Sequence, residues 1–549
     1  MFKIIIILAF LPFFNFAQKA IVAERIHTPL GIPLNLSTLF GDICPNHLHM
    51  GLDFRTNGVE GIPIYSIREG YISRIRISRG GYGRVLYANH ANGQTSVYAH
   101  CSIFSKEIDS MVTSWLINRE QNEIDTLLSS EAIPIARGEL IAFSGNSGSS
   151  TGPHLHFEIR ETASEIALNP LDHGFTLIDD TPPIIESIKL VPISQEGFEI
   201  GSSSIAVTPS LLSSTSGQLA PQISLSTLDF SNTNGFGIMI RGGDRMKING
   251  NKFDFYKTQV FFDSTLVFQS VMDSISFDHT RYVNDYCDYK AYSSGKTKWH
   301  KLFHSEGNPL SIYKVNKIQE SIVSFSTKKT LVKLVVSDKN NFSSTYCFWL
   351  LPFPIDYQQV IFDTLSYFLP KNNIFSKYKN FQFQLEPFTL MQPVKKNNLL
   401  NSKIPLSKAA SVIVPLPNQD PEKSYIKIEG KYSKSRIESG KLITETKTLG
   451  IPSLTWDTLA PKITALSYNS NDTTCSQKTL KWKISDQQSE IGEYFLYIND
   501  EFTPVYFDLK SNTISTSSTS ISKGKIQVIL VVKDIFGNEA IHKQLLTLF

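Results

Sequence analysis

Short strand-like runs, separated by turn residues, follow one another in the N-terminal region of the chain. Residues 71–78 alternate as a half-buried strand does. Residues 85–90 and 94–100 are strand-like and flank an Asn-Gly pair, which predicts a β-hairpin. Within residues 106–131 the apolar positions recur at roughly helical spacing, without Gly or Pro. These positions are Ile108, Met111, Val112, Trp115, Leu116 and Ile124. The pattern predicts a small β domain interrupted by one or two helices.

An internal repeat organises the rest of the chain. Similar Asp-Thr segments, beginning at Asp180 and Asp457, each open a β-rich unit, and similar apolar runs ending in Asp338 and Asp534 close the two units. The opening and closing aspartates lie 77 residues apart in the second unit and 158 in the first. The shorter length suits a seven-stranded sandwich, so the longer unit should carry an insertion of about 80 residues.

These patterns divide the chain into consecutive units. We predict a mainly β protein, in which the small antiparallel β domain is followed by β-sandwich units that resemble the immunoglobulin fold. The predicted bounds are 18–175 for the first domain, with its insertion at about 106–131, 180–351 for a sandwich with an insertion, 352–456 for a proline-rich β domain or connection, and 457–549 for a C-terminal immunoglobulin-like unit.

Composition and charge remove several classes of function. Hydrophobic residues make up 41% and charged residues 19%, which excludes a largely disordered chain. The net charge of +3 gives no excess of positive charge for binding nucleic acid or an anionic membrane. The five cysteines are widely spaced and show no disulfide framework or metal knuckle, although one Cys44–Cys101 bridge is compatible with an oxidising compartment.

The N-terminus has the pattern of a secretory signal. Lys3 precedes an apolar run over residues 4–14, and Ala17 provides a small residue at the expected cleavage point. The run is shorter than the roughly 20 residues that a membrane helix needs. A buried first strand is the alternative. We therefore expect residues 1–17 to be removed, and the mature protein to be exported without a transmembrane segment, to the periplasm or to the cell surface and medium.

Histidines concentrate in the first domain, where seven of the twelve lie between residues 47 and 173. His49 and Asp53 are four apart, so they share one face of an extended strand, and Gly51 between them leaves room for an ion. A His and a carboxylate placed in this way can bind one metal ion.

A second motif contains His154 and His156, which also share one strand face. An H-x-H pair can supply two metal ligands, so spacing alone leaves open which of the two binds an ion. His100 ends the second strand of the predicted hairpin, between the two motifs in the chain.

Together these motifs resemble those of the lysostaphin/LytM-type zinc endopeptidase family. The hallmarks are H-x-G-x-D at residues 49–53, Y-x-H at residues 98–100 and G-x-S-x-G-P-H-L-H-F-E at residues 148–158. The resemblance covers about residues 38–172. It implies a small antiparallel β fold with a groove, acting on the peptides of bacterial peptidoglycan. The helical insertion departs from the family, which usually has a short loop there.

The resemblance also implies roles for five residues. His49, Asp53 and His156 would bind one zinc ion per chain, and His100 and His154 would be catalytic. Three protein ligands leave a fourth position for water, whose pKa zinc lowers to about 7. One catalytic histidine would accept the water's proton, and the other would stabilise the oxyanion or protonate the leaving amine. The resemblance leaves these two roles interchangeable.

Other histidines fit the pattern less well. His47 shares the strand face of His49 and is expected to line the groove. His300 and His304 are four apart but lack the glutamate of an H-E-x-x-H motif, so we expect both to be solvated.

The sequence thus predicts an exported zinc metalloendopeptidase that cleaves peptide cross-links of peptidoglycan. A D-alanyl–diaminopimelate cross-link is preferred over a glycine bridge, because the chain shows no wall-targeting module typical of glycine-bridge lysins. The β units would position the enzyme against the wall or an envelope protein partner. Two alternatives are a catalytically silent regulator of other wall hydrolases, which the presence of all five residues disfavours, and a surface adhesion or scaffold protein.

Overall fold

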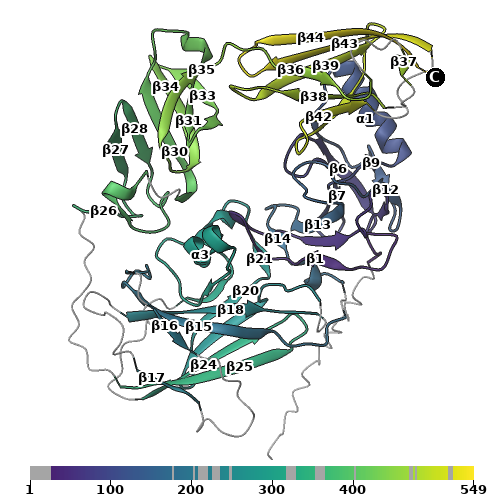
Figure 1. The fold of residues 1–549 in the computed structure, drawn as a ribbon. Helices are drawn as coiled ribbons and strands as arrows, with labels where there is room; N and C mark the ends of the chain where they lie inside the picture. Colours follow the sequence, from purple (N-terminus) through teal and green to yellow (C-terminus); the bar gives the residue numbers. More distant parts are fainter. Residues whose placement is uncertain are drawn as a thin grey trace, which may run out of the picture.

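The computed structural model consists of successive β-rich units joined along the chain (Figure 1). It describes residues 26–175, 178–201, 204–207, 220–224, 235–246, 250–316, 329–352, 365–400, 404–468, 474–475, 479–516 and 524–548. The predicted signal segment, residues 1–17, lies outside the described residues. The prediction of a mainly β protein with antiparallel sheets is confirmed.

One antiparallel sheet carries Asp53, His154 and His156, and His100 directly follows one of its strands. Its order is β1 (Leu36–Thr38), β4 (Leu52–Arg55), β13 (His154–Glu161), β8 (Gln94–Ala99), β7 (Arg84–Asn89), β6 (Gly70–Ile77) and β10 (Ile124–Leu127). A smaller sheet of β5 (Pro63–Tyr65), β12 (Leu140–Phe143) and β9 (Ile103–Phe104) packs beside it. Leu52, Phe54, Leu155 and Phe157 alternate into the core and are fully buried. The polar residues between them therefore face away from that core.

The predicted hairpin and helix both form, but the insertion contains one helix followed by a strand. Helix α1 (Lys106–Arg119) ends where Glu120 adopts a left-handed backbone, with φ of 48°. The chain then returns to the sheet, and Ile124, which we expected on a helix, opens β10 and pairs with Ile77. Three residues of α1 are buried in the domain core: Ile108, Val112 and Leu116.

The core of the first domain continues into the next unit. Strand β14 (Ala167–Leu168) pairs with β21 (Ser274–Ile275), and residues between 253 and 312 join the same apolar cluster. The expectation that His300 and His304 are solvated is wrong, because this packing buries both of them. His300 accepts or donates a 3.1 Å hydrogen bond with the Tyr286 hydroxyl, and His304 Nε2 donates to the Asn308 carbonyl at 2.8 Å.

The second unit is a pair of sheets around one apolar cluster. The first sheet has the order β16 (Ile205–Val207), β15 (Ile184–Ile193), β18 (Gly235–Gly243) and β22 (His300–Lys301). The second has the order β17 (Gln222–Ile223), β25 (Ser343–Leu350), β24 (Thr330–Ser337), β19 (Lys257–Phe262), β20 (Thr265–Val271) and β23 (Tyr313–Asn316). Two short helices, α2 (Val283–Tyr286) and α3 (Tyr289–Gly295), lie within its long insertion.

The third and fourth units each have an apolar cluster of their own. The third contains β27 (Ile374–Tyr378), β28 (Phe381–Leu385), β30 (Pro405–Pro415), β34 (Lys441–Thr448) and β33 (Ser435–Glu438), facing β32 (Lys431–Ser433), β31 (Ser424–Ile428) and β35 (Pro452–Trp456). The C-terminal unit contains β36 (Lys462–Ala465), β38 (Lys481–Ser485), β42 (Thr513–Thr516) and β41 (Val505–Asp508), and a second sheet of β37 (Thr474–Cys475), β44 (Glu539–Leu548), β43 (Gly524–Asp534), β39 (Ile491–Ile498) and β40 (Glu501–Phe502). Its immunoglobulin-like character stays a prediction.

The C-terminal unit lies against the first domain, beside α1 (Figure 1). Asn122 makes two hydrogen bonds to it, donating to the Tyr494 carbonyl at 2.7 Å and accepting from the Val505 amide at 2.8 Å. The Arg84 guanidinium lies 3.6 Å from the centre of the Tyr506 ring. The insertion therefore contributes both to the core of the first domain and to its contact with the last unit.

Two further expectations concern cysteines and membrane segments. Cys44 and Cys101 are free thiols, so the Cys44–Cys101 bridge is absent from this structure. Among the described helices, none has the length and apolar character needed to cross a bilayer.

Candidate active site

Strand register brings the two histidine motifs together. On β4 and β13, Asp53 is the direct antiparallel partner of His156. On the other side of β13, His156 pairs with Ala99, the residue before His100. Residues that are about 50 and 100 positions apart in sequence therefore converge on one face of the sheet.

The expectation that His49 and Asp53 share one face of a single extended strand is wrong, because β4 begins at Leu52. His49 reaches the same place from the segment between β3 (His47–Leu48) and β4. Its backbone amide donates to the Asp42 carbonyl at 2.9 Å, and its carbonyl accepts from the Gly41 amide at 2.8 Å. The chain then passes so close to β13 that a Cβ at Gly51 would lie 2.2 Å from the Phe157 carbonyl oxygen. Glycine is required there because no side chain fits in that space.

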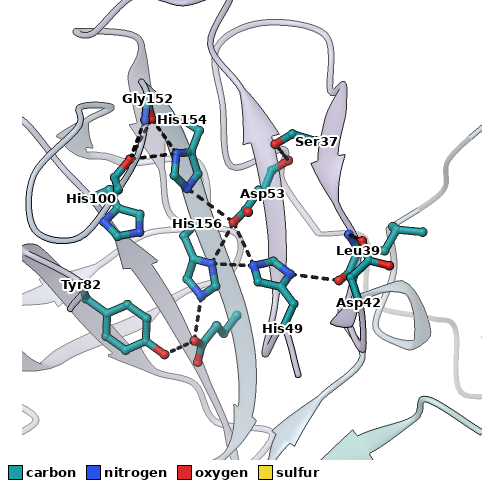
Figure 2. A network of polar contacts seen from close by, with 12 residues as sticks. Ser37, Leu39, Asp42, His49, Asp53, Tyr82, His100, Gly152, His154 and His156 are labelled. Carbon is teal, nitrogen blue, oxygen red and sulfur yellow. Dashed lines mark hydrogen bonds and ion pairs between the residues drawn. The ribbon is translucent and has the colours of Figure 1, made fainter. Parts of the chain in front are cut away.

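Three acceptor atoms converge at the centre of the site (Figure 2). His49 Nε2 lies 3.0 Å from Asp53 Oδ1 and 3.1 Å from His156 Nδ1, and His156 Nδ1 lies 2.8 Å from Asp53 Oδ1. The other ring nitrogen of each histidine points away from this centre and makes a hydrogen bond. His49 Nδ1 donates to the Leu39 carbonyl at 2.9 Å, and His156 Nε2 donates to Glu158 Oε1 at 2.8 Å.

This tautomer pattern fits a metal site. A carbonyl oxygen accepts only, so the proton of the His49 ring sits on Nδ1 and Nε2 presents a lone pair. Two imidazole nitrogens and one carboxylate oxygen are ligands that suit zinc, and a second hydrogen bond on each histidine orients the ring. The donor set therefore fits a tetrahedral ion with one open position.

Glu158 is the centre of a buried polar network behind His156. Its carboxylate also accepts from Arg160 Nε at 2.7 Å and from the Tyr82 hydroxyl. The Tyr82 ring is stacked on His156, with ring centres 5.3 Å apart. Our sequence interpretation included Glu158 in a motif without giving it a role, and gave none to Tyr82 or Arg160. Glu158 and Arg160 follow His156 at every second position, so all three share one face of the strand. This spacing was the signal from which their place in the network behind His156 could have been predicted.

The charges of the site shift several pKa values. Burial would lower the pKa of the His156 ring, but Asp53 and Glu158 outweigh it and raise this pKa to about 9 in the metal-free protein. Burial opposes ionisation of Glu158, yet Arg160 and His156 lower the pKa of its carboxyl to about 2. Burial also opposes ionisation of Asp53, but the neighbouring histidines hold its pKa well below the usual range.

His100 and His154 stand beside the three converging residues, with their ring centres 4.8 Å apart. His154 Nδ1 donates to the Gly152 carbonyl at 2.8 Å, and its Nε2 lies 3.5 Å from Asp53 Oδ1. His100 Nδ1 donates to the Ser147 carbonyl at 2.8 Å. Burial, with the nearby His156 and His154, lowers the pKa of His100 to about 3. Both rings therefore direct Nε2 lone pairs away from their backbone anchors.

The backbone conformation of His100 and the position of His47 also bear on the site. His100 has φ of 60°, in the left-handed region that a residue with a side chain seldom adopts, and such backbone concentrates at functional sites. His47 lies on the short hairpin strand β3 (His47–Leu48), is exposed, and donates to the Pro45 carbonyl at 3.0 Å. Its expected place in a groove stays a prediction.

Comparison with known proteins bears on a quarter of the chain. No protein-family model matches the chain. The DD-carboxypeptidase/endopeptidase Mpg of Neisseria meningitidis serogroup B is 32% identical over 148 residues, which are 27% of this chain and 26% of that protein. An uncharacterized metalloprotease of Haemophilus influenzae is 31% identical over 147 residues, which are 27% of this chain and 24% of that protein. This stretch is similar to bacterial metallopeptidases. The predicted resemblance to lysostaphin/LytM-type peptidases is confirmed for it.

The chain spans about a quarter of the length of these curated relatives. Among solved structures, the catalytic domain of lysostaphin from Staphylococcus simulans is 22% identical and covers 25% of this chain and 90% of that one, with a TM-score of 0.20. The catalytic domain of the prophage-encoded M23 protein EnpA from Enterococcus faecalis is 21% identical and covers 27% and 94%, also with a TM-score of 0.20.

Proposed function

We propose that the protein is an exported, zinc-dependent endopeptidase that cleaves peptide cross-links of bacterial peptidoglycan. The observation that carries the proposal is the convergence of His49 Nε2, Asp53 Oδ1 and His156 Nδ1 within 3.1 Å, with both outward ring nitrogens already hydrogen-bonded. Three electron-pair donors packed so closely repel one another unless a cation or a proton lies between them. These residues would hold one zinc ion per chain.

A zinc ion held there would polarise the scissile carbonyl and lower the pKa of a bound water. The chain's own histidines then handle the protons. We assign acceptance of the water's proton to His154, because its Nε2 lone pair lies on the side of Asp53, 3.5 Å from Oδ1. His100 is neutral at neutral pH, so it can protonate the leaving amine only after it receives the proton that His154 takes from the water.

Similarity to relatives supports the substrate class. One relative is named a DD-carboxypeptidase/endopeptidase, a name that favours a bond following a D-amino acid over a glycine bridge. We therefore propose the D-alanyl–diaminopimelate cross-link as the substrate bond. The signal-like N-terminus supports delivery to the periplasm or cell surface, where that bond occurs.

Digestion of a defined cross-linked muropeptide tests this function. The zinc-loaded mature protein should convert the dimer into two monomers, which mass spectrometry identifies by the newly freed D-alanyl carboxyl group. The His154→Ala variant, loaded with zinc in the same way, serves as the control. Zinc binding without cleavage of any muropeptide would instead support the regulator alternative. Binding of the β units to the wall, by a protein that neither binds zinc nor cleaves muropeptides, would support the scaffold alternative.

A further inference from the structure

Two acidic clusters lie outside the peptidase site, at matching places in the two repeat units. Asp457, Asp486 and Asp534 form one, and in it one carboxylate oxygen of each residue lies within 4.8 Å of the others. Each comes from a different part of the C-terminal unit. Asp457 precedes the first strand β36, Asp486 directly follows β38, and Asp534 ends β43.

The second unit repeats this arrangement with Asp179, Asp244 and Asp338, whose carboxylate oxygens also lie within 4.8 Å of one another. Asp179 precedes the first strand β15, Asp244 directly follows β18, and Asp338 directly follows β24. In each unit the first two aspartates flank a pair of antiparallel strands, β36 with β38 and β15 with β18. The repeat seen in the sequence therefore extends to a similar side-chain arrangement, although the first member here is Asp179 and not Asp180, the residue that matches Asp457 in the sequence repeat.

Two of the three aspartates in each cluster are buried, and some of the carboxylate oxygens lack a hydrogen-bond partner among the described residues. Asp457 is 0% exposed and Asp338 is 2% exposed. Asp457 Oδ1 accepts a hydrogen bond from the Leu459 amide at 3.0 Å, and Asp338 Oδ1 accepts one from the Phe342 amide at 3.0 Å. Oδ2 of Asp457, Asp486 and Asp338 is buried and accepts no hydrogen bond from any residue that the structure describes. A buried acceptor without a partner is costly, and a buried carboxylate more so.

Positive charge is also lacking. In the described part of the chain, none of the six aspartates forms an ion pair with Lys, Arg or His. The Lys423 ammonium beside the C-terminal cluster donates to Asn538 Oδ1. Lys339, next to Asp338 in the chain, pairs with Asp172. Three carboxylates facing one another without a cation repel strongly in a buried site.

We propose that each of the two clusters binds one divalent cation, and that the ion is calcium. The ligands are all carboxylate oxygens, which suit hard cations and not the zinc of the peptidase site. Calcium accepts six to eight oxygens in flexible geometry, so carbonyls and water can complete the shell around three aspartates. Magnesium would keep more of its own water and needs near-octahedral geometry, which fits a site with three converging carboxylates less well.

The C-terminal site would stiffen a junction between units. Asp457 follows the last strand of the third unit directly, and its amide donates to the Lys423 carbonyl of that unit at 3.0 Å. Asn538 donates from Nδ2 to the Asp457 carbonyl at 3.3 Å and to Asp534 Oδ2 at 2.7 Å. A calcium ion held by Asp457, Asp486 and Asp534 would thus tie the linker to the body of the C-terminal unit.

Calcium titration of the full-length, zinc-loaded protein in calcium-free buffer tests the proposal. We expect about two saturable calcium ions per chain by calorimetry, with affinity in the range of extracellular calcium modules, about 10⁻⁴–10⁻³ M, and a rise in the unfolding temperature. Magnesium at the same concentrations should bind more weakly. Asp457→Asn should leave about one site, as should Asp338→Asn, because Asn retains the Oδ1 acceptor for the backbone amide but loses the charge.

Melting curves separate a metal site from a structural role. Without calcium, Asp457→Asn should unfold at or above the wild-type temperature, since one repelling charge is gone. With calcium, the unfolding temperature of this variant should rise less than that of the wild type, because only the cluster of the second unit can still bind the ion. Asp500→Asn, an exposed change in the same unit, should behave as wild type. Absence of saturable calcium binding would overturn the proposal. So would undiminished binding in both cluster variants, or equal destabilisation with and without calcium. Peptidase activity plays no part in any of these outcomes.

Discussion

Glu158→Gln is a sensitive test of how the site is built, because it changes a residue that touches no ion. Glu158 is fully buried, and its carboxylate accepts the Nε2 proton of His156 at 2.8 Å. When the His156 ring is neutral, that contact keeps its proton on Nε2 and its lone pair on Nδ1, which faces Asp53. Gln has nearly the same shape, but it can present its NH₂ group to the ring and lacks the charge that makes His156 a stronger ligand.

The expected magnitude follows from the role of such outer partners. Their loss typically weakens metal binding about 10–100-fold, equivalent to about 1.4–2.7 kcal/mol. Zinc affinity measured by competition with a chelating dye should therefore fall by this amount. The apoprotein should stay folded, although Arg160 loses the charge of its 2.7 Å partner and some stability with it.

Glu161→Gln is the matched control, because Glu161 lies on the same strand and is exposed. Its zinc affinity should equal that of the wild type. A Glu158→Gln protein that is folded and binds zinc within about twofold of wild type would refute the reasoning that Glu158 orients a metal ligand.

The remaining predictions concern ligands, protons and the docking of the last unit. His156→Ala should lose both zinc and activity, whereas His154→Ala should lose activity and keep most of the zinc by elemental analysis; the reverse pattern would exchange their roles. Zinc binding at pH 7.5 should release about one proton, because His156 has a pKa of about 9 in the metal-free protein and must be neutral to bind zinc. Calorimetry in buffers of different ionisation enthalpy measures this release as a change in the observed heat of binding. Apparent zinc affinity should accordingly rise with pH up to about 9, and a flat profile from pH 6 to 9 would contradict this assignment. Asn122→Ala removes both hydrogen bonds of Asn122 to the last unit, worth about 1–3 kcal/mol together, so amide exchange at Val505 should accelerate about 5–150-fold; unchanged exchange would show that Asn122 does not hold the two units together.

Local patterns predicted the elements that local physics determines. The period-two alternation and the Asn-Gly turn gave the hairpin of β7 and β8, and the alternation around His154 and His156 correctly indicated which side chains share a face. The approach of Asp53 and His156 followed from the same periodicity, because the register of β4 and β13 aligns their polar faces. The position of His49 did not, because this residue lies before β4.

Contacts between distant segments were beyond such patterns. Ile124 continues the apolar spacing of α1, yet it lies in a strand because the edge of β6 offers backbone partners. His300 and His304 are buried because the insertion of the second unit packs on the first domain, and nothing in their local sequence marks that surface. Glu158 appears in the sequence only as part of a motif, and its role emerges from the three groups that it contacts.

The location of bound zinc is the most direct test of the central claim. A crystal structure of the purified protein, with anomalous data collected on both sides of the zinc absorption edge, should show one strong zinc peak. We predict that this ion lies about 2.0–2.2 Å from His49 Nε2, Asp53 Oδ1 and His156 Nδ1, with a fourth position open toward His154. A zinc peak coordinated by His154 or His100 in place of these atoms, or no peak at this site in zinc-supplemented crystals, would contradict the account.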